Sequence, residues 1–274
     1  MREYADIADD ESVKTLGLYW DPKADSLNYF VNLEIQQKVT KLVVLSTMSK
    51  IFDPLRLICP IVVKVKLLLQ QICQSRVGWD ESLPMDLDTC WRTFQKQLIE
   101  INDIRIPRRV TTPNFSRIEL YGFYDAPERA YGACVYVRTT DVNGIHFSKL
   151  ISAKLRVSPL KVVALPRLEL CGALLLVRLM TKIAENVKLK CMNRYYWCDS
   201  TIVLHWIAAE PITWKTFVTN RVAEIRESTT VEWKYVNSEL NPVDIVSRGA
   251  SPRQLFKSEL WWYGPEFLLK NSEH

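Results

Sequence analysis

The chain has 274 residues, of which 48% are hydrophobic and 24% are charged, and it contains only 8 glycines. These values are typical of a globular protein with a sizeable core, and they exclude collagenous, low-complexity and disordered chains. The formal net charge of +5 permits contact with a polyanion but does not require it.

The N-terminal residues predict neither export nor membrane insertion. The start MREYADIADDES is acidic and lacks the cationic and apolar stretches of a secretory signal. The most apolar windows, 55–73 and 168–180, are too interrupted or too short to span a bilayer, so we expect a soluble chain. The 7 cysteines form no Cys-x-x-Cys pair, which indicates buried thiols in a reducing compartment.

The first part of the chain is predicted to be mostly helical. Residues 16–33 contain two short strands around the turn-forming DPKAD, and apolar residues recur at helical spacing over 38–75 and 85–103. Prolines, threonines and an asparagine interrupt this pattern in IRIPRRVTTPNFSR, residues 104–117. We therefore expect two domains, 1–110 and 111–274.

The second part alternates strands and helices. Its predicted strands are 118–125, 130–138, 145–153, 194–198 and 231–236. Its predicted helices are 166–187, 200–208, 214–227 and one that starts near Pro242. This order predicts an α/β domain in which helices flank a mixed five-stranded sheet.

Four acids fall at strand ends and helix starts of this predicted sheet: Asp125, Glu169, Asp199 and Asp244. Each has an ordinary structural explanation, as a turn residue, a helix cap or an acid in the first turn of a helix. Together they would converge at one edge, where their repulsion is costly unless cations neutralise it. Oxygen ligands without a histidine or cysteine cluster indicate Mg²⁺ or Mn²⁺ rather than zinc.

Long stretches around these acids resemble a known family. They are GFYDA, SAKLRVSPLKVVALPRLELCGALL, YYWCDSTIVLHWI, WKTFVTNRVAEI and WKYVNSELNPVDIVSRG. They resemble the RNase H domain of Pao/BEL-type LTR retrotransposon Pol polyproteins. The earlier stretches LGLYWDPKADSLNYFV, TKLVVLSTMSKIFDPLRLICPIVVKVKLLLQQI and WDESLP are similar to the segment that follows the reverse transcriptase palm, and LWWYGPEFL also fits. The resemblance covers nearly the whole chain.

The resemblance implies an RNase H-like fold and hydrolysis of the RNA strand of an RNA/DNA hybrid with two Mg²⁺ or Mn²⁺ ions. It assigns the ligand roles to Asp125, Glu169, Asp199 and Asp244. Asp125 would bridge both ions, and Asp244 would help to hold the ion that activates the attacking water. Glu169 and Asp199 would hold the ion at the leaving oxygen.

The resemblance also implies partners for the chain. Residues 1–110 would be a thumb or connection-like segment, and the polymerase palm and integrase of the same Pol polyprotein would be partners. The chain has no Tyr-x-Asp-Asp motif, so it cannot polymerise alone. We expect it in the cytoplasm, in a virus-like particle during replication, or in the nucleus. Basic residues near the acids are candidate phosphate contacts or solvated surface: Lys154, Arg156, Lys161 and Arg248.

Four positions depart from the family pattern without removing a metal ligand: Leu42, Arg56, Pro127 and Val243. Arg56 stands where the family has glycine, which predicts a side chain in a backbone conformation that glycine prefers. A decayed module that binds nucleic acid or serves as a scaffold is therefore an alternative function. An aspartic peptidase is a third, but its Asp-Thr/Ser-Gly loop is absent, since Asp88-Thr89-Cys90 and Asp199-Ser200-Thr201 lack the glycine.

Overall fold

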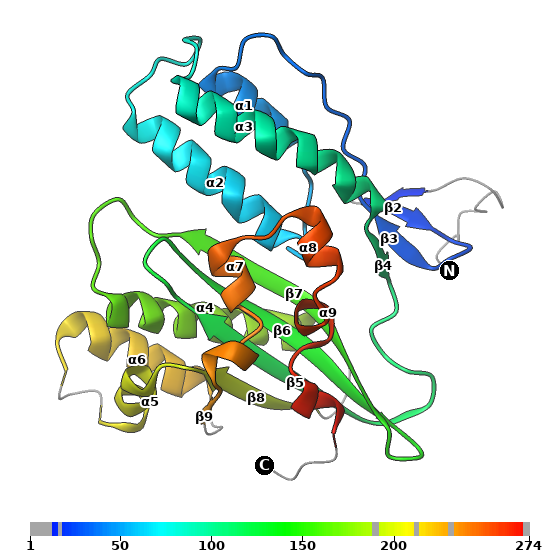
Figure 1. Ribbon diagram of the computed structural model, residues 1–274. Coiled ribbons are helices and arrows are strands. Elements are labelled where there is room, and N and C mark those ends of the chain that lie inside the picture. Colours follow the sequence, from blue (N-terminus) through cyan, green and yellow to red (C-terminus); the bar gives the residue numbers. More distant parts are fainter. Residues whose placement is uncertain (1–12, 16–17, 188–191, 211–213, 230–232, 271–274) are drawn as a thin grey trace, which may run out of the picture. The chain divides into compact units, whose positions relative to one another are not determined.

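The computed structural model describes residues 13–15, 18–187, 192–210, 214–229 and 233–270. The chain forms two compact units (Figure 1). The first consists of Met1–Pro54 and Leu68–Arg109, and the second of Leu55–Leu67 and Val110–His274. Within the described residues, no helix combines the length and the apolar character needed to cross a membrane.

The segment Leu55–Leu67 belongs to the second unit, whereas the sequence predicted a single boundary between residues 110 and 111. Hydrogen bonds explain the difference. The carbonyl oxygen of Leu55 accepts from the Ala153 N–H at 3.0 Å and from the Ser152 hydroxyl at 3.1 Å. The hydrogen-bond donors lie almost a hundred residues away, so local sequence patterns cannot predict that this segment belongs to the second unit.

The first unit combines a small sheet with helices. Its strands are β1 (Val13–Thr15), β2 (Leu18–Asp21), β3 (Ser26–Asn28) and β4 (Arg105–Pro107), which pair in the order β1-β2-β3-β4. Its helices are α1 (Lys41–Ser49), α3 (Met85–Leu98) and η1 (Ile99–Asp103), while α2 (Cys59–Gln74) contributes residues to both units. The Asp21 carboxylate accepts from the N–H groups of Lys23 and Ala24, which closes the predicted turn.

The interrupted stretch 104–117 contains a strand, β4, that the sequence did not predict. Ile106 lies opposite Leu27 in antiparallel pairing with β3, and its side chain is buried. The partner strand is distant in sequence, and a three-residue strand gives too short a pattern to be recognised. The same stretch also contains the first residues of the next strand, β5.

The second unit is built on a mixed five-stranded sheet with the order β7-β6-β5-β8-β9, which confirms the predicted α/β fold class. Strands β5, β6 and β7 form an antiparallel meander, and β8 and β9 run parallel to β5. The strands are β5 (Phe115–Asp125), β6 (Ala130–Asp141), β7 (His146–Val157), β8 (Met192–Cys198) and β9 (Trp233–Tyr235). Residues 231 and 232 of the predicted last strand lie outside the described residues.

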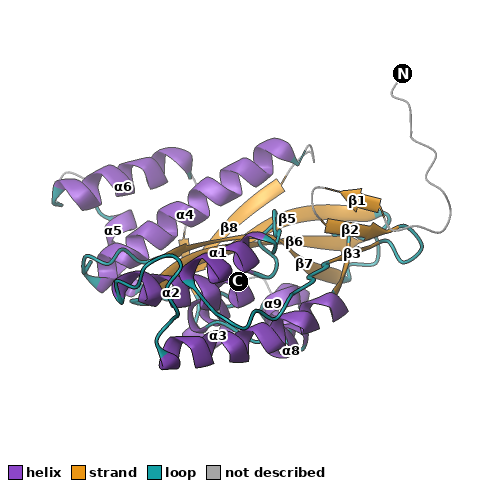
Figure 2. Cartoon of the chain, turned by 90° about the horizontal axis from the view of Figure 1, so that it is seen from above, coloured by secondary structure: helices purple, strands orange, loops and turns teal. Residues whose placement is uncertain are grey.

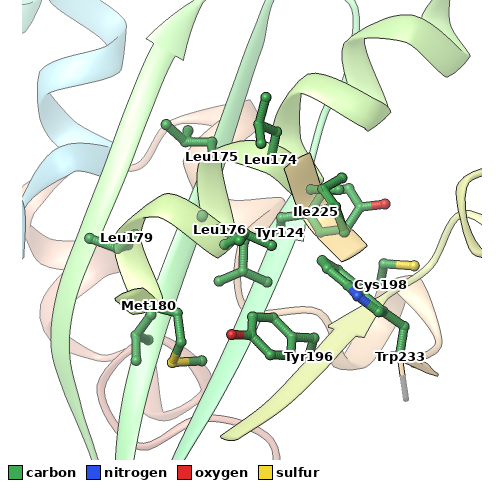
Figure 3. Close-up of a cluster of buried hydrophobic side chains, with 14 of the residues drawn as sticks. Tyr124, Leu174, Leu175, Leu176, Leu179, Met180, Tyr196, Cys198, Ile225 and Trp233 are labelled. Carbon is green, nitrogen blue, oxygen red and sulfur yellow. The ribbon is translucent and has the colours of Figure 1, made fainter. Parts of the chain in front are cut away.

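Helices α4 (Leu165–Asn186), α5 (Thr201–Ala208) and α6 (Thr216–Ser228) cover one face of this sheet (Figure 2). Figure 3 shows their core, in which Leu176 and Met180 of α4 lie near Tyr124 and Tyr196 of the sheet. A Cβ atom at Gly172 would lie 2.7 Å from Cδ2 of Tyr124, so the absence of a side chain lets α4 approach the sheet closely.

Residues near the C-terminus pack on the opposite face of the sheet, since alternate strand residues point to opposite faces. The indole N–H of the fully buried Trp261 donates to the Leu57 carbonyl at 2.8 Å, and the Tyr136 hydroxyl donates to the Trp261 carbonyl at 2.8 Å. The Phe267 ring packs against Phe123 and Trp197. The elements are η3 (Ser238–Leu240), α7 (Asp244–Arg248), α8 (Pro252–Phe256), α9 (Glu259–Tyr263) and η4 (Glu266–Leu269).

Candidate active site at the carboxyl edge of the sheet

The four predicted acids lie where the parallel strands end. Asp125 is the last residue of β5, and Asp199 follows the last residue of β8. Asp244 is the first residue of α7. Helix α4 begins at Leu165, so Glu169 lies just past its first turn, which has no acid, and not within it as the sequence predicted. Carboxyl ends of parallel strands are where α/β sheets bind ligands.

These four acids, which we call the acidic quartet, lie close enough for their charges to affect one another. Burial raises the pKa of Asp125 to about 6, and the Asp199 and Asp244 carboxylates add to the rise, while a hydrogen bond from the Ala126 N–H opposes it. Burial and then the Asp199 charge raise the pKa of Glu169, against a hydrogen bond from Ser200. Each member therefore interacts with at least one other member.

Ser200 has two roles beside the quartet. Its hydroxyl oxygen accepts from the Val203 N–H and so caps α5, and it donates to the Glu169 carboxylate at 2.5 Å. Because Ser200 caps this helix, Asp199 is not its N-cap, and the capping explanation of Asp199 is wrong. A serine that directly follows a strand-end acid and opens a helix is the signal that sequence reasoning could have used.

Asn241 is a site residue that sequence reasoning missed. Its side chain is fully buried, its amide N–H donates to the Tyr124 carbonyl at 2.8 Å, and its amide oxygen accepts from the Val243 N–H at 3.1 Å. These bonds tie the loop that precedes Asp244 to the end of β5, next to Asp125. The asparagine before Pro242 was a local signal for a special loop, but its partner is more than a hundred residues away.

The four candidate phosphate contacts lie in different places. Arg248 lies on α7, and its Nε is 3.1 Å from a carboxylate oxygen of Asp244. Lys154 and Arg156 lie on β7, and Lys161 is exposed between β7 and α4. Burial lowers the pKa of Lys154, and neighbouring cations add to the effect: Lys182, Arg156, Arg178 and Arg56. Lys154 and Arg156 therefore belong to a cluster of positive charge that also includes residues of α4.

The departures from the family pattern have distinct structural consequences. The φ of Arg56 is 63°, which confirms the prediction that this side chain occupies a backbone conformation suited to glycine. Val243 is fully buried, and its Cγ1 would lie 3.4 Å from a Cβ atom at Gly132. Pro127 is half-buried after the end of β5, and Leu42 is exposed on α1.

The quartet fits a divalent cation by charge and donor chemistry. Its ligands are carboxylate oxygens, which hard ions such as Mg²⁺ and Mn²⁺ prefer. The raised pKa of Asp125, caused in part by two neighbouring carboxylates, marks a place where a cation would relieve repulsion. Among the described residues, no group of three or more histidine, cysteine or acidic side chains is gathered closely enough to hold an ion.

The strand order, with a helix after the meander and acids at the carboxyl edge, defines an RNase H-like domain. The family model of the Pao retrotransposon-like RNaseH-like domain matches residues 40–200, more than half of the chain, and the chain belongs to this family. The matched residues include Asp125, Glu169 and Asp199, whereas Asp244 lies beyond them.

Two solved RNase H structures are similar to part of the chain. The N-terminal RNase H domain of rv2228c from Mycobacterium tuberculosis, solved as a fusion with maltose-binding protein, is 11% identical with a TM-score of 0.33, over 48% of this chain and 96% of that chain. RNase H1 from the halophilic archaeon Halobacterium salinarum is 12% identical with a TM-score of 0.23, over 44% and 84%. No curated protein matches the chain.

Proposed function

We propose that the chain hydrolyses the RNA strand of RNA/DNA hybrids in a reaction that depends on Mg²⁺ or Mn²⁺. The observation that carries this proposal is the position of the half-buried Asp125 at the end of the central strand, where the charges of Asp199 and Asp244 add to the rise of its pKa. Membership of the Pao retrotransposon-like RNaseH-like family supports the same reaction class. A half-buried carboxylate beside two others is unfavourable for folding, and a bound cation would offset this repulsion.

The acidic quartet would hold two ions, which supply an activated water and stabilise the leaving oxygen when bound. In this proposal Asp125 contributes to both positions, Asp244 to the position of the attacking water, and Glu169 with Asp199 to the position of the leaving oxygen. Ser200 orients the Glu169 carboxylate through its 2.5 Å hydrogen bond. Asn241 holds the loop that carries Asp244 against β5.

The basic residues Lys154, Arg156, Lys161 and Arg248 are proposed to contact phosphates of the hybrid. Such contacts recognise the shape of the duplex, and 2′-hydroxyl contacts would distinguish the RNA strand. Arg248 pairs with Asp244 in the structure, so it supplies positive charge directly beside the quartet. We further propose that residues 1–110 act as a thumb or connection-like segment with the palm and integrase of the same polyprotein.

A cleavage assay tests the proposed function. The full chain is incubated with an RNA/DNA hybrid labelled on either strand, in Mg²⁺, in Mn²⁺ and in EDTA. The matched control is the double variant Asp125→Asn, Asp199→Asn, whose fold is checked by circular dichroism. We expect cut RNA and intact DNA for the wild-type chain with metal only. Equal cleavage by the folded double variant, or none by the folded wild-type chain, would contradict the proposal.

A further inference from the structure

A pocket lined by arginines lies on the helical side of the second unit. It has a volume of about 260 Å³ and is lined by the guanidinium-bearing side chains Arg156 of β7, Arg178 of α4 and Arg221 of α6. Tyr131 and Asn220 add neutral polar groups, and Glu224 of α6 is the acid in its lining. We call these six residues the basic pocket. None of them belongs to the acidic quartet.

The three arginines are held differently. Nε and Nη2 of Arg178 donate to Oε1 and Oε2 of Glu224 at 2.6 and 2.8 Å, so this pair is bidentate. The Arg221 guanidinium lies 3.6 Å from the centre of the Phe217 ring, and its Nη1 donates to the Phe217 carbonyl at 2.9 Å. The Arg156 side chain is exposed. Arg221 is thus fixed in place, while Arg178 is engaged by a carboxylate.

The charges of the basic pocket do not cancel. Three guanidinium groups face one carboxylate, which leaves an excess of positive charge. The excess extends beyond the pocket, because Arg156, Arg178 and Lys182 all contribute repulsion that lowers the pKa of the neighbouring Lys154. A planar guanidinium that binds a carboxylate through two parallel bonds can bind two phosphate oxygens in the same way.

We propose that the basic pocket binds a phosphate group of a nucleic-acid strand, and that Glu224 is an internal competitor which the phosphate displaces from Arg178. The inference rests on the proposed function, because it takes the nucleic acid to be the hybrid substrate. Arg156 and Arg221 add positive charge that Glu224 does not neutralise. This excess favours a phosphate that Arg178 binds through two oxygens over the Glu224 carboxylate. The ion pair is half exposed, so water can enter as the partners exchange.

The decisive variant is Glu224→Gln, because it should strengthen binding, and a gain of affinity cannot arise from misfolding. Hybrid affinity is measured by fluorescence anisotropy in the full chain carrying Asp125→Asn, so that the substrate stays intact. Glu224→Gln should tighten binding roughly threefold to fivefold, the strength of an exposed ion pair, and Arg178→Gln should weaken it similarly. Arg178→Gln should also lower the slope of log affinity against log salt by about 1.

Matched controls separate the pocket from general charge effects. Glu227→Gln removes an exposed carboxylate from the same helix, and Arg253→Gln removes an exposed arginine from α8. Both should change affinity less than their pocket counterparts. With Arg178→Gln already present, Glu224→Gln should give little further tightening. If Glu227→Gln tightens binding as much as Glu224→Gln, or if Glu224→Gln has no effect, the inference is wrong.

A second arm distinguishes a nucleic-acid phosphate from a free one, and the inference from the proposed function. In one outcome, inorganic phosphate raises the unfolding temperature only when Arg178 is present, and the pocket variants bind the hybrid as tightly as before. This outcome would assign the pocket to a free anion and overturn the inference. Tightening by Glu224→Gln in a chain that cleaves no hybrid would support the inference while the proposed function fails. If the chain cleaves the hybrid but the pocket variants leave hybrid affinity unchanged, the proposed function holds and the inference is wrong.

Discussion

At the scale of single residues, Asp125 couples stability to the proposed chemistry. Its pKa is raised from 3.8 to about 6 by burial and by the charges of Asp199 and Asp244. Between these pH values the folded chain binds more protons than the unfolded chain, so the free energy of unfolding falls as the pH rises. The destabilisation by the ionised Asp125 carboxylate is fully present above about pH 6, and it is absent below the pKa of this group in the unfolded chain.

Asp125→Asn is therefore expected to stabilise the metal-free chain at about pH 7.5, on the order of 2 kcal/mol. The amide keeps the size of the side chain and can still accept from the Ala126 N–H. Urea unfolding in EDTA measures the difference, which should disappear near pH 4. Glu128→Gln, which removes an exposed carboxylate three residues further on, should leave stability unchanged. A wild-type chain as stable as Asp125→Asn at about pH 7.5 would contradict this account.

Arg56 stores backbone strain in the second unit. Its φ of 63° places Cβ too close to its own carbonyl oxygen, whereas glycine adopts this conformation without cost. Arg56→Gly should raise the free energy of unfolding by about 1 kcal/mol. Arg56→Ala removes the same charge and keeps Cβ, so it should give no such gain in denaturant unfolding. Equal stabilities of these two variants would show that backbone strain at this position contributes nothing to stability.

At the scale of elements, the sequence predicted the strands and helices whose formation depends on neighbouring residues. The strands and helices of the second unit follow from apolar periodicity and from turn residues, and they lie close to the predicted ranges. Strand β4 was missed because its partner, β3, lies in a hairpin near the N-terminus. Its three residues form a strand only in that pairing.

The candidate site was predictable in part for the same reason. Acids at strand ends can be read from the sequence once a sheet is predicted, since parallel strands bring their carboxyl ends to one edge. The residues that hold those acids could not be read in this way. Asn241 acts by reaching the Tyr124 carbonyl, and Ser200 acts by reaching Glu169, so each role exists only in the folded chain. The strained conformation of Arg56 was predictable only from the resemblance, because glycine stands at this position in the family.

At the scale of the whole molecule, both faces of the sheet of the second unit are covered, and one of them is covered by segments distant in sequence. Helix α4 covers one face, and the other is packed by residues from α9 and η4 together with Leu55–Leu67. Trp261 joins these segments, because its ring is buried, its N–H binds Leu57, and its carbonyl binds Tyr136. The folded state of the proposed nuclease unit therefore depends on residues well outside its sheet.

Trp261→Ala should lower the free energy of unfolding by about 3 to 5 kcal/mol, because it leaves a cavity and removes the hydrogen bond to the Leu57 carbonyl. Trp262→Ala is the matched control, since Trp262 is only half-buried, donates to the carbonyl of nearby Leu255, and should cost less. Chemical unfolding followed by far-UV circular dichroism compares them. If the two substitutions lower the free energy of unfolding equally, Trp261 does not join these segments. The C-terminal residues then contribute little to the stability of the sheet.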